Sequence, residues 1–173
     1  MRKIILLLSL FSLVSAKGMA KGSAATVAVK DATGKDMGSV KIKSIATGVE
    51  LKLNLHGFTP GEHAIHFHQN AKCDAPDFKS AGPHFNPDGK KHGLENPEGC
   101  HAGDMLNFTA DDKGNAKATI VNKSVSLGTD DHSLYSNGGT ALVVHAKADD
   151  MKTDPAGNAG DRIACGVIAK DAK

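Results

Sequence analysis

His66 and His68 flank a single phenylalanine in this 173-residue chain. Residues two apart on a β-strand point to the same face, so both imidazoles can reach one metal ion from a rigid base. The pattern is equally compatible with a pair of polar side chains whose hydrogen bonds are satisfied within the protein. His145 ends the apolar segment 141–145, where a buried strand emerges, and taken alone it is better explained as a core or edge histidine.

A second group has the donor types and spacing of a zinc site. Its members follow the order H-x7-H-x8-H-x2-D and are His84, His92, His101 and Asp104. Three imidazoles and one carboxylate complete a tetrahedral ligand set for zinc. Segment 70–103 is rich in glycine and proline and has no periodicity, so metal ligation would replace the core that it lacks. The alternative is a solvated loop that happens to carry histidines.

The elements that must position these residues are strands. Residues 49–55 alternate apolar and polar side chains, which is typical of a strand with one buried face. Weaker alternation or continuous apolar character predicts further strands at 25–30, 39–45, 115–121, 141–144 and 163–168. Turn-forming residues separate them at 32–34, 59–61, 112–114 and 137–139. Many short strands with regular turns predict an all-β sandwich or barrel, interrupted by irregular segments 70–103 and 147–162.

The first residues have the composition of a secretory signal peptide. Arg2 and Lys3 precede an apolar run at 4–14 that is too short to cross a bilayer. We expect cleavage after Ala16, with a second candidate site after Ala20; the alternative is a buried N-terminal helix. Residues 17–173 are then long enough for a single domain. No cysteine follows the apolar run, so no membrane anchor is expected.

Export and net charge limit the chemistry of the mature chain. Removing Arg2 and Lys3 leaves 19 basic residues against 19 acidic ones, so nucleic acid is not a favoured partner. Any attraction of an anion must come from a local patch. Export places the three cysteines in an oxidising compartment, where two can pair and one is left over.

Five segments together resemble the copper–zinc superoxide dismutase family, in its secreted bacterial (periplasmic) form. They are GEHAIHFH (61–68), AGPHFNPDGKKHG (81–93), GCHAGD (99–104), ALVVHAKADD (141–150) and GNAGDRIACGVI (157–168). The resemblance covers nearly the whole mature chain. It implies a Greek-key β-sandwich or flattened eight-stranded barrel with two long functional loops.

The resemblance also implies one copper ion and one zinc ion per subunit. Copper would be held by His66, His68, His84 and His145. Zinc would be held by His84, His92, His101 and Asp104. His84 would therefore belong to both sets, as an imidazolate that bridges the two metals.

Outside the ligands, the resemblance implies roles for four more residues. Asp149 would link a copper histidine to a zinc histidine, although it could also be an ordinary turn carboxylate. Cys73 and Cys165 would form an intrachain disulfide. Arg162 would be the active-site arginine that attracts and orients a small anion. The alternative for Arg162 is a surface side chain paired with its neighbour Asp161.

The implied function is dismutation of superoxide to dioxygen and hydrogen peroxide, with His84 and Arg162 as catalytic residues, in defence against superoxide outside the cytoplasm. The alternative is a secreted protein that binds or carries copper or zinc without catalysis. The presence of all four copper positions and Arg162 favours the enzyme. Superoxide is the expected partner, the chain is a monomer or a homodimer, and Cys100 is the unpaired cysteine.

Overall fold

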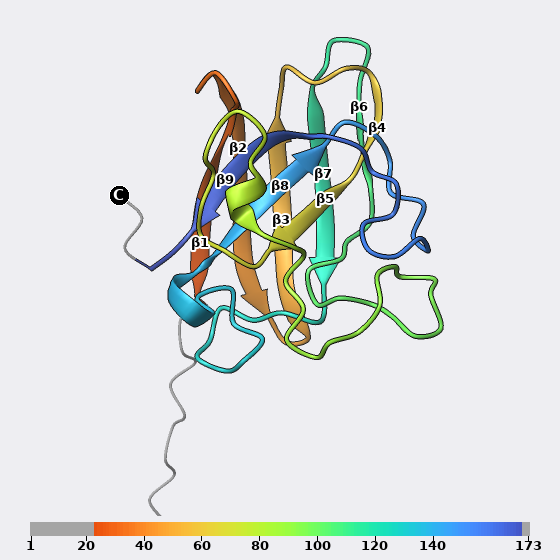
Figure 1. Ribbon diagram of the computed structural model, residues 1–173. Coiled ribbons are helices and arrows are strands. Elements are labelled where there is room, and N and C mark those ends of the chain that lie inside the picture. The colour runs from red at the N-terminus through yellow and green to blue at the C-terminus, as the bar shows by residue number, and fades with distance from the viewer. Residues whose placement is uncertain (1–22, 171–173) are drawn as a thin grey trace, which may run out of the picture.

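A computed structural model describes residues 23–170, and in this part the chain forms nine β-strands and two short 3-10 turns (Figure 1). The strands are β1 (Ala24–Asp31), β2 (Asp36–Ile45), β3 (Gly48–Leu55), β4 (Gly61–His63), β5 (Ile65–His68), β6 (Phe108–Ala110), β7 (Ala116–Asn122), β8 (Thr140–His145) and β9 (Arg162–Ile168). The turns are η1 (Lys79–Ala81) and η2 (Ser136–Gly138). The expected signal peptide, with both cleavage sites, lies outside the described residues. Within residues 23–170 no helix is long and apolar enough to cross a membrane.

Seven strands form one antiparallel sheet in the order β5-β8-β9-β1-β2-β3-β7, and β4 pairs separately with β6. The sheet curls on itself, so that β8 and β9 pass in front of β2, β3 and β7 in Figure 1. The pairings β3–β7, β5–β8 and β1–β9 join strands distant in sequence, as in a Greek key. Only Ala64 separates β4 from β5, and counting them as one bent strand gives eight strands. The predicted all-β class is confirmed.

The alternation of β3 explains how the core is filled. Its residues Val49, Leu51, Leu53 and Leu55 are buried, whereas the residues between them face outward. Leu51 lies opposite Ile42 of β2 and Ile120 of β7, which are also buried. Apolar side chains from both layers of the curled sheet therefore meet in one core, and their burial is the main favourable term in folding.

The irregular segments lie where the sequence predicts them, with one addition. Residues 69–107 connect β5 to β6 and contain only η1, and residues 146–161 connect β8 to β9. Arg162 is the first residue of β9 and not the last residue of the preceding loop. A third irregular segment, 123–139 between β7 and β8, was not predicted.

The long segment 69–107, here called the metal loop, is fastened to β5 by a close approach of backbones. Phe67 N donates to Gly103 O at 3.0 Å, Phe85 N donates to Phe67 O at 2.8 Å, and Gly103 N donates to Phe85 O at 2.8 Å. A Cβ atom at Gly103 would collide with the carbonyl oxygen of Phe67, so only glycine fits there. This fastening places His84 and Asp104 beside the histidines of β5.

We predict that Gly103→Ala lowers the free energy of unfolding by about 1–3 kcal/mol, because the new methyl group must push backbone atoms apart. Gly128→Ala is the matched control, since its Cβ would meet only the side chains of Asp130 and Ser126, which can move. Urea unfolding of the two metal-free, disulfide-bonded variants measures the difference. Equal free energies of unfolding for the two variants would contradict the close approach of the Gly103 and Phe67 backbones.

Candidate metal centre

Four buried histidines from three parts of the chain meet beside β5. They are His66 and His68 of β5, His145 at the end of β8, and His84 of the metal loop. One ligand atom of each lies within 4.8 Å of the others. The residues expected to hold copper are thus brought together, and His84 reaches them because it forms an isolated β-bridge with His68.

The hydrogen bonds of these rings leave one nitrogen of each ring without a partner. His68 Nδ1 lies 2.8 Å from Gly82 O, His145 Nδ1 lies 3.3 Å from Gly160 O, and His66 Nε2 lies 2.8 Å from an oxygen of Asp149. The remaining nitrogens are buried and make no hydrogen bond: His66 Nδ1, His68 Nε2, His84 Nε2 and His145 Nε2.

Buried polar atoms without partners are unfavourable in a folded protein. A cation that takes imidazole ligands, such as copper, would satisfy all four nitrogens at once. The bonds to carbonyl and carboxylate oxygens fix which nitrogen of each ring carries the lone pair, as is usual around metal sites. The donor set therefore fits a copper ion.

The second cluster is centred on one carboxylate oxygen. His84 Nδ1, His92 Nδ1 and His101 Nδ1 lie 2.8, 3.0 and 3.4 Å from Asp104 Oδ1. The other oxygen, Asp104 Oδ2, accepts hydrogen bonds from the backbone N–H groups of Gly93 and His101. The hydrogen bonds to the three histidine rings and to the backbone of Gly93 outweigh the opposing effect of burial, and they keep the pKa of Asp104 far below its usual value. Three imidazoles and one carboxylate fit zinc.

His84 belongs to both clusters through different atoms of one ring. Its Nδ1 lies in the cluster around Asp104, and its Nε2 lies in the copper-type cluster. Burial lowers the pKa of His84 to about 4, although Asp104 opposes the shift. Burial and the neighbouring His66 lower the pKa of His145 to about 3. Both rings are therefore neutral near pH 7 and have a lone pair to offer a metal ion.

The carboxylate of Asp149 contacts one histidine of each cluster. Its Oδ2 lies 2.8 Å from His66 Nε2, and its Oδ1 lies 3.0 Å from His92 Nε2. Burial opposes ionisation, but these hydrogen bonds prevail and hold the pKa of Asp149 below its usual value. Asp149 is therefore not an ordinary turn carboxylate, because its two oxygens contact histidines of both clusters.

Asn107 holds Asp149 in place and was missed in the sequence. Asp149 N donates to Asn107 Oδ1 at 2.9 Å, and Asn107 Nδ2 donates to Asp149 O at 3.0 Å. This reciprocal pair fixes the backbone whose side chain bonds two ligand histidines. A single asparagine in a loop carries no sequence signal for such a role.

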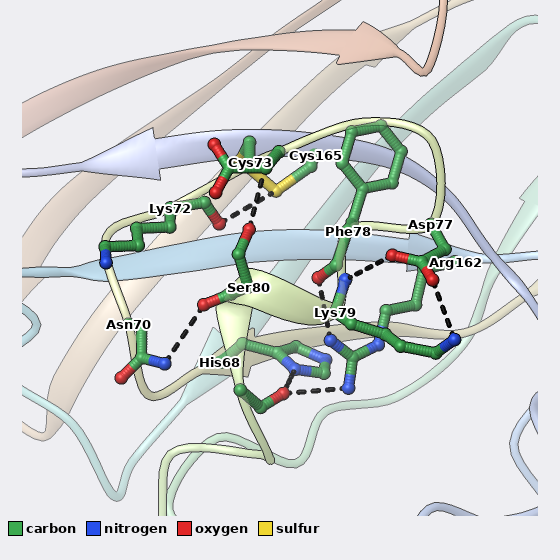
Figure 2. The surroundings of a disulfide bond; sticks show 12 residues. His68, Asn70, Lys72, Cys73, Asp77, Phe78, Lys79, Ser80, Arg162 and Cys165 are labelled. Carbon is green, nitrogen blue, oxygen red and sulfur yellow. Dashed lines mark hydrogen bonds and ion pairs between the residues drawn. A yellow bond between two sulfur atoms is a disulfide. The ribbon is translucent and has the colours of Figure 1, made fainter.

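Arg162 is tied to the metal loop near the copper-type cluster (Figure 2). Its Nη1 donates to Phe78 O and its Nη2 donates to Gly82 O, each at 2.8 Å. Gly82 O is also the partner of His68 Nδ1, so one carbonyl links the guanidinium to a ligand histidine. The structure contains no ion pair between Arg162 and Asp161 within residues 23–170.

The disulfide expected between Cys73 and Cys165 is present, with sulfur atoms 2.02 Å apart and a sequence separation of 92 residues. It fastens the start of the metal loop to β9, the strand that begins with Arg162 (Figure 2). Covalent closure of so long a loop restricts the unfolded chain strongly. The bridge thus keeps the carbonyl partners of Arg162 next to the guanidinium.

A cleft of about 780 Å³ opens onto the copper-type cluster. Its lining includes His68, His84 and His145 and the cationic residues Lys90, Lys91 and Arg162. Asp154 also lines it, 3.6 Å from Lys91, whereas Lys90 makes no ion pair among residues 23–170. Three cationic groups and one carboxylate therefore lie along the cleft, beside three histidines of the copper-type cluster.

The other histidines and the third cysteine lie outside both clusters. His63 is buried between the carbonyl oxygens of His145 and Thr59, so its role is structural. His56 and His132 make partly exposed ion pairs with aspartates. Cys100 is partly exposed, and burial raises the pKa of its thiol, which disfavours the thiolate that binds metals.

We predict that zinc binding to the metal-free protein at pH 7 releases about one proton from His92. Burial lowers the pKa of His92, but hydrogen bonds to Asp104 and Asp149 outweigh it and raise the pKa to about 9. A zinc ligand must lose that proton, so apparent zinc affinity should increase with pH until about 9. Titration calorimetry in buffers of different ionisation enthalpy measures the release; heats independent of the buffer would contradict it.

Comparison with known proteins identifies the family. Residues 37–168 match the family described as copper/zinc superoxide dismutase. The chain is 53% identical over 137 residues to superoxide dismutase [Cu-Zn] 2 of Aquifex aeolicus, covering 78% of this chain and 80% of that protein. It is 48% identical over 147 residues to superoxide dismutase [Cu-Zn] of Caulobacter vibrioides, covering 83% and 84%. The structure of Cu/Zn superoxide dismutase from Brucella abortus has a TM-score of 0.71 at 31% identity, covering 84% of this chain and 99% of that one. The chain belongs to the copper/zinc superoxide dismutase family.

Proposed function

We propose that this chain catalyses dismutation of superoxide with the residue roles expected from its sequence. His66, His68, His84 and His145 hold copper, and His84, His92, His101 and Asp104 hold zinc. The observation that carries the assignment is the set of four buried imidazole nitrogens without partners, on histidines whose ligand atoms lie within 4.8 Å of one another beside a cleft that is also lined by Arg162. When bound, copper supplies the one-electron chemistry, oxidising one superoxide and reducing a second, whereas zinc has no redox role.

Arg162 guides the substrate. Superoxide is a small anion, and a guanidinium that stays charged at all relevant pH values attracts and orients it in the cleft. The two carbonyl oxygens of Phe78 and Gly82 fix the orientation of the side chain without neutralising its charge. Lys90 and Lys91 add positive charge along the cleft.

The reaction consumes two protons for each pair of superoxide ions that becomes dioxygen and hydrogen peroxide. Nε2 of His84 is buried among the proposed copper ligands on a residue that lines the cleft, and it is the atom that can hold one of these protons. Nδ1 of the same ring lies 2.8 Å from Asp104 Oδ1, within the cluster that we propose holds zinc. Asp149 holds His66 and His92 in the orientation that keeps both ligand sets intact.

We also propose that the chain is exported and acts in the periplasm. Residues 1–16 have the composition of a signal peptide, and a disulfide is stable in an oxidising compartment. Mass spectrometry of the exported protein tests the cleavage site, with Lys17 or, for the alternative site, Lys21 as its first residue. Protection would then act on superoxide formed outside the cytoplasm.

We predict that His145→Ala abolishes dismutation by the copper- and zinc-loaded protein and lowers copper content, because it removes one of four copper donors. Zinc content should stay at one per chain, since His145 is not in the cluster around Asp104. Superoxide consumption and elemental analysis measure the two effects. Full dismutation by the variant, or full metal occupancy of the wild type without dismutation, would contradict the assignment.

We predict that Arg162→Gln lowers kcat/KM for superoxide about tenfold or more, and that Arg162→Lys recovers part of the loss, because steering depends on charge. The dependence of the rate on ionic strength should be weaker in Arg162→Gln. Pulse radiolysis at several salt concentrations, with copper content measured in parallel, separates steering from metal loss. An unchanged salt dependence would contradict a steering role for Arg162.

A further inference from the structure

The outward face of β1, β2, β3 and β7 carries five lysines. We call this surface the lysine face. Its lysines are Lys30, Lys41, Lys43, Lys52 and Lys117, and its strands carry the carboxylates Asp31, Asp36 and Glu50. At its borders, Lys30 lines a depression with Asp31 and with Cys73 of the metal loop, and Lys117 lines one with Asp111. The mature chain has balanced charges, so this excess is a local feature and not a consequence of overall composition.

The register of the strands concentrates the charge. Lys41 of β2 lies directly opposite Lys52 of β3, and like charges in directly opposed positions destabilise a sheet. Lys52 is 3.6 Å from Glu50, but both side chains keep solvent contact, so this pair is weak. Among residues 23–170, Lys30, Lys41, Lys43 and Lys117 make no ion pair.

Asp36 lies opposite Lys30 at the end of β2, and its carboxylate is 3.4 Å from Nε2 of His56 rather than in an ion pair with a lysine. Four lysines of the face are therefore left without an ion pair among residues 23–170 and can contact an external anion.

Between the lysines, the face offers hydrogen-bond donors on a shallow surface. Lys52 lies opposite Thr119, and Asn54 lies opposite Lys117, so these four outward side chains form a square across β3 and β7. They line a shallow depression together with Leu53 and Ala118. Two ammonium groups, an amide and a hydroxyl can all donate to the oxygens of a phosphate group.

We propose that the lysine face docks this protein on the surface of a membrane that contains anionic phospholipids. A broad, slightly hollowed sheet surface with separated lysines matches the diffuse negative charge of a bilayer, to which each nearby lysine contributes favourably. The outward positions of these strands hold no arginine and no aromatic residue, the usual means of binding nucleic acids. The contact is peripheral and requires no membrane anchor.

The position of the face determines the consequence of docking. In Figure 1, β2, β3 and β7 form the far layer, and the first part of the metal loop, with η1, lies in front of β8 and β9. The lining of the metal cleft includes no residue of β1, β2, β3 or β7. A protein docked through its lysine face would therefore leave the residues of the cleft free of lipid contact. Docking would confine dismutation, the function proposed above, to the vicinity of the membrane without blocking the cleft.

Co-sedimentation of the metal-loaded mature protein with vesicles tests the proposal. We expect binding at low salt to vesicles of phosphatidylcholine with phosphatidylglycerol, little binding to phosphatidylcholine alone, and loss of binding at high salt. The triple variant Lys41→Gln, Lys52→Gln, Lys117→Gln should lower the partition coefficient roughly 100-fold. The matched control Lys72→Gln, Lys79→Gln, Lys152→Gln removes the same charge elsewhere and should lower it only a few-fold.

Two readouts keep the test independent of folding and of catalysis. Dismutase activity in solution should be unchanged in the triple variant of Lys41, Lys52 and Lys117, and the thermal midpoint of Lys41→Gln should rise, because it relieves the repulsion with Lys52. Equal loss of binding in the two triple variants, binding that persists at high salt, or no binding to phosphatidylglycerol vesicles would overturn the proposal. Binding to dextran sulfate but not to vesicles would also overturn it, in favour of an anionic polysaccharide.

Discussion

Four imidazole nitrogens buried without hydrogen-bond partners are the constraint on which the rest of this structure depends. Such atoms are unfavourable unless something accepts their lone pairs, and a copper ion would do so for all four. The same ring of His84 faces the zinc-type cluster with its other nitrogen. Occupation of either cluster would therefore fix a residue of the other, and two metals would stabilise one shared geometry.

The surroundings of the clusters serve to hold that geometry. Asp149 bonds His66 and His92, Asn107 holds the backbone of Asp149, and the carbonyl of Gly82 joins His68 to Arg162. The metal loop buries a few apolar side chains, such as Phe78, Phe85 and Met105, and it is also held by its backbone contact with β5, its candidate metal ligands and its disulfide to β9. A loop ordered in this way can keep an open cleft above the copper site, which a packed hydrophobic core would fill.

Period-two alternation was enough to predict the strands around 49–55 and the all-β class, because each buried face must repeat every second residue. The zinc-type group was visible in the sequence as spaced donors, whereas the copper-type group, the sharing of His84 and the pairing of Cys73 with Cys165 came from resemblance to a family. Asn107 and the irregular segment 123–139 were missed, because their roles arise from tertiary contacts without a local pattern. The lysine face could not be predicted either, because the pairing of Lys41 with Lys52 across two strands can be recognised only when the strand register is known.

The roles proposed for the site depend on the sharing of His84 between the two clusters. Anomalous diffraction from crystals of the copper- and zinc-loaded protein can detect this shared ligand. Data collected at the copper and zinc absorption edges distinguish the two ions and locate each relative to the ring. We expect copper next to Nε2 of His84 and zinc next to Nδ1. A structure in which both sites are filled and His84 contacts only one metal would contradict the shared ligand.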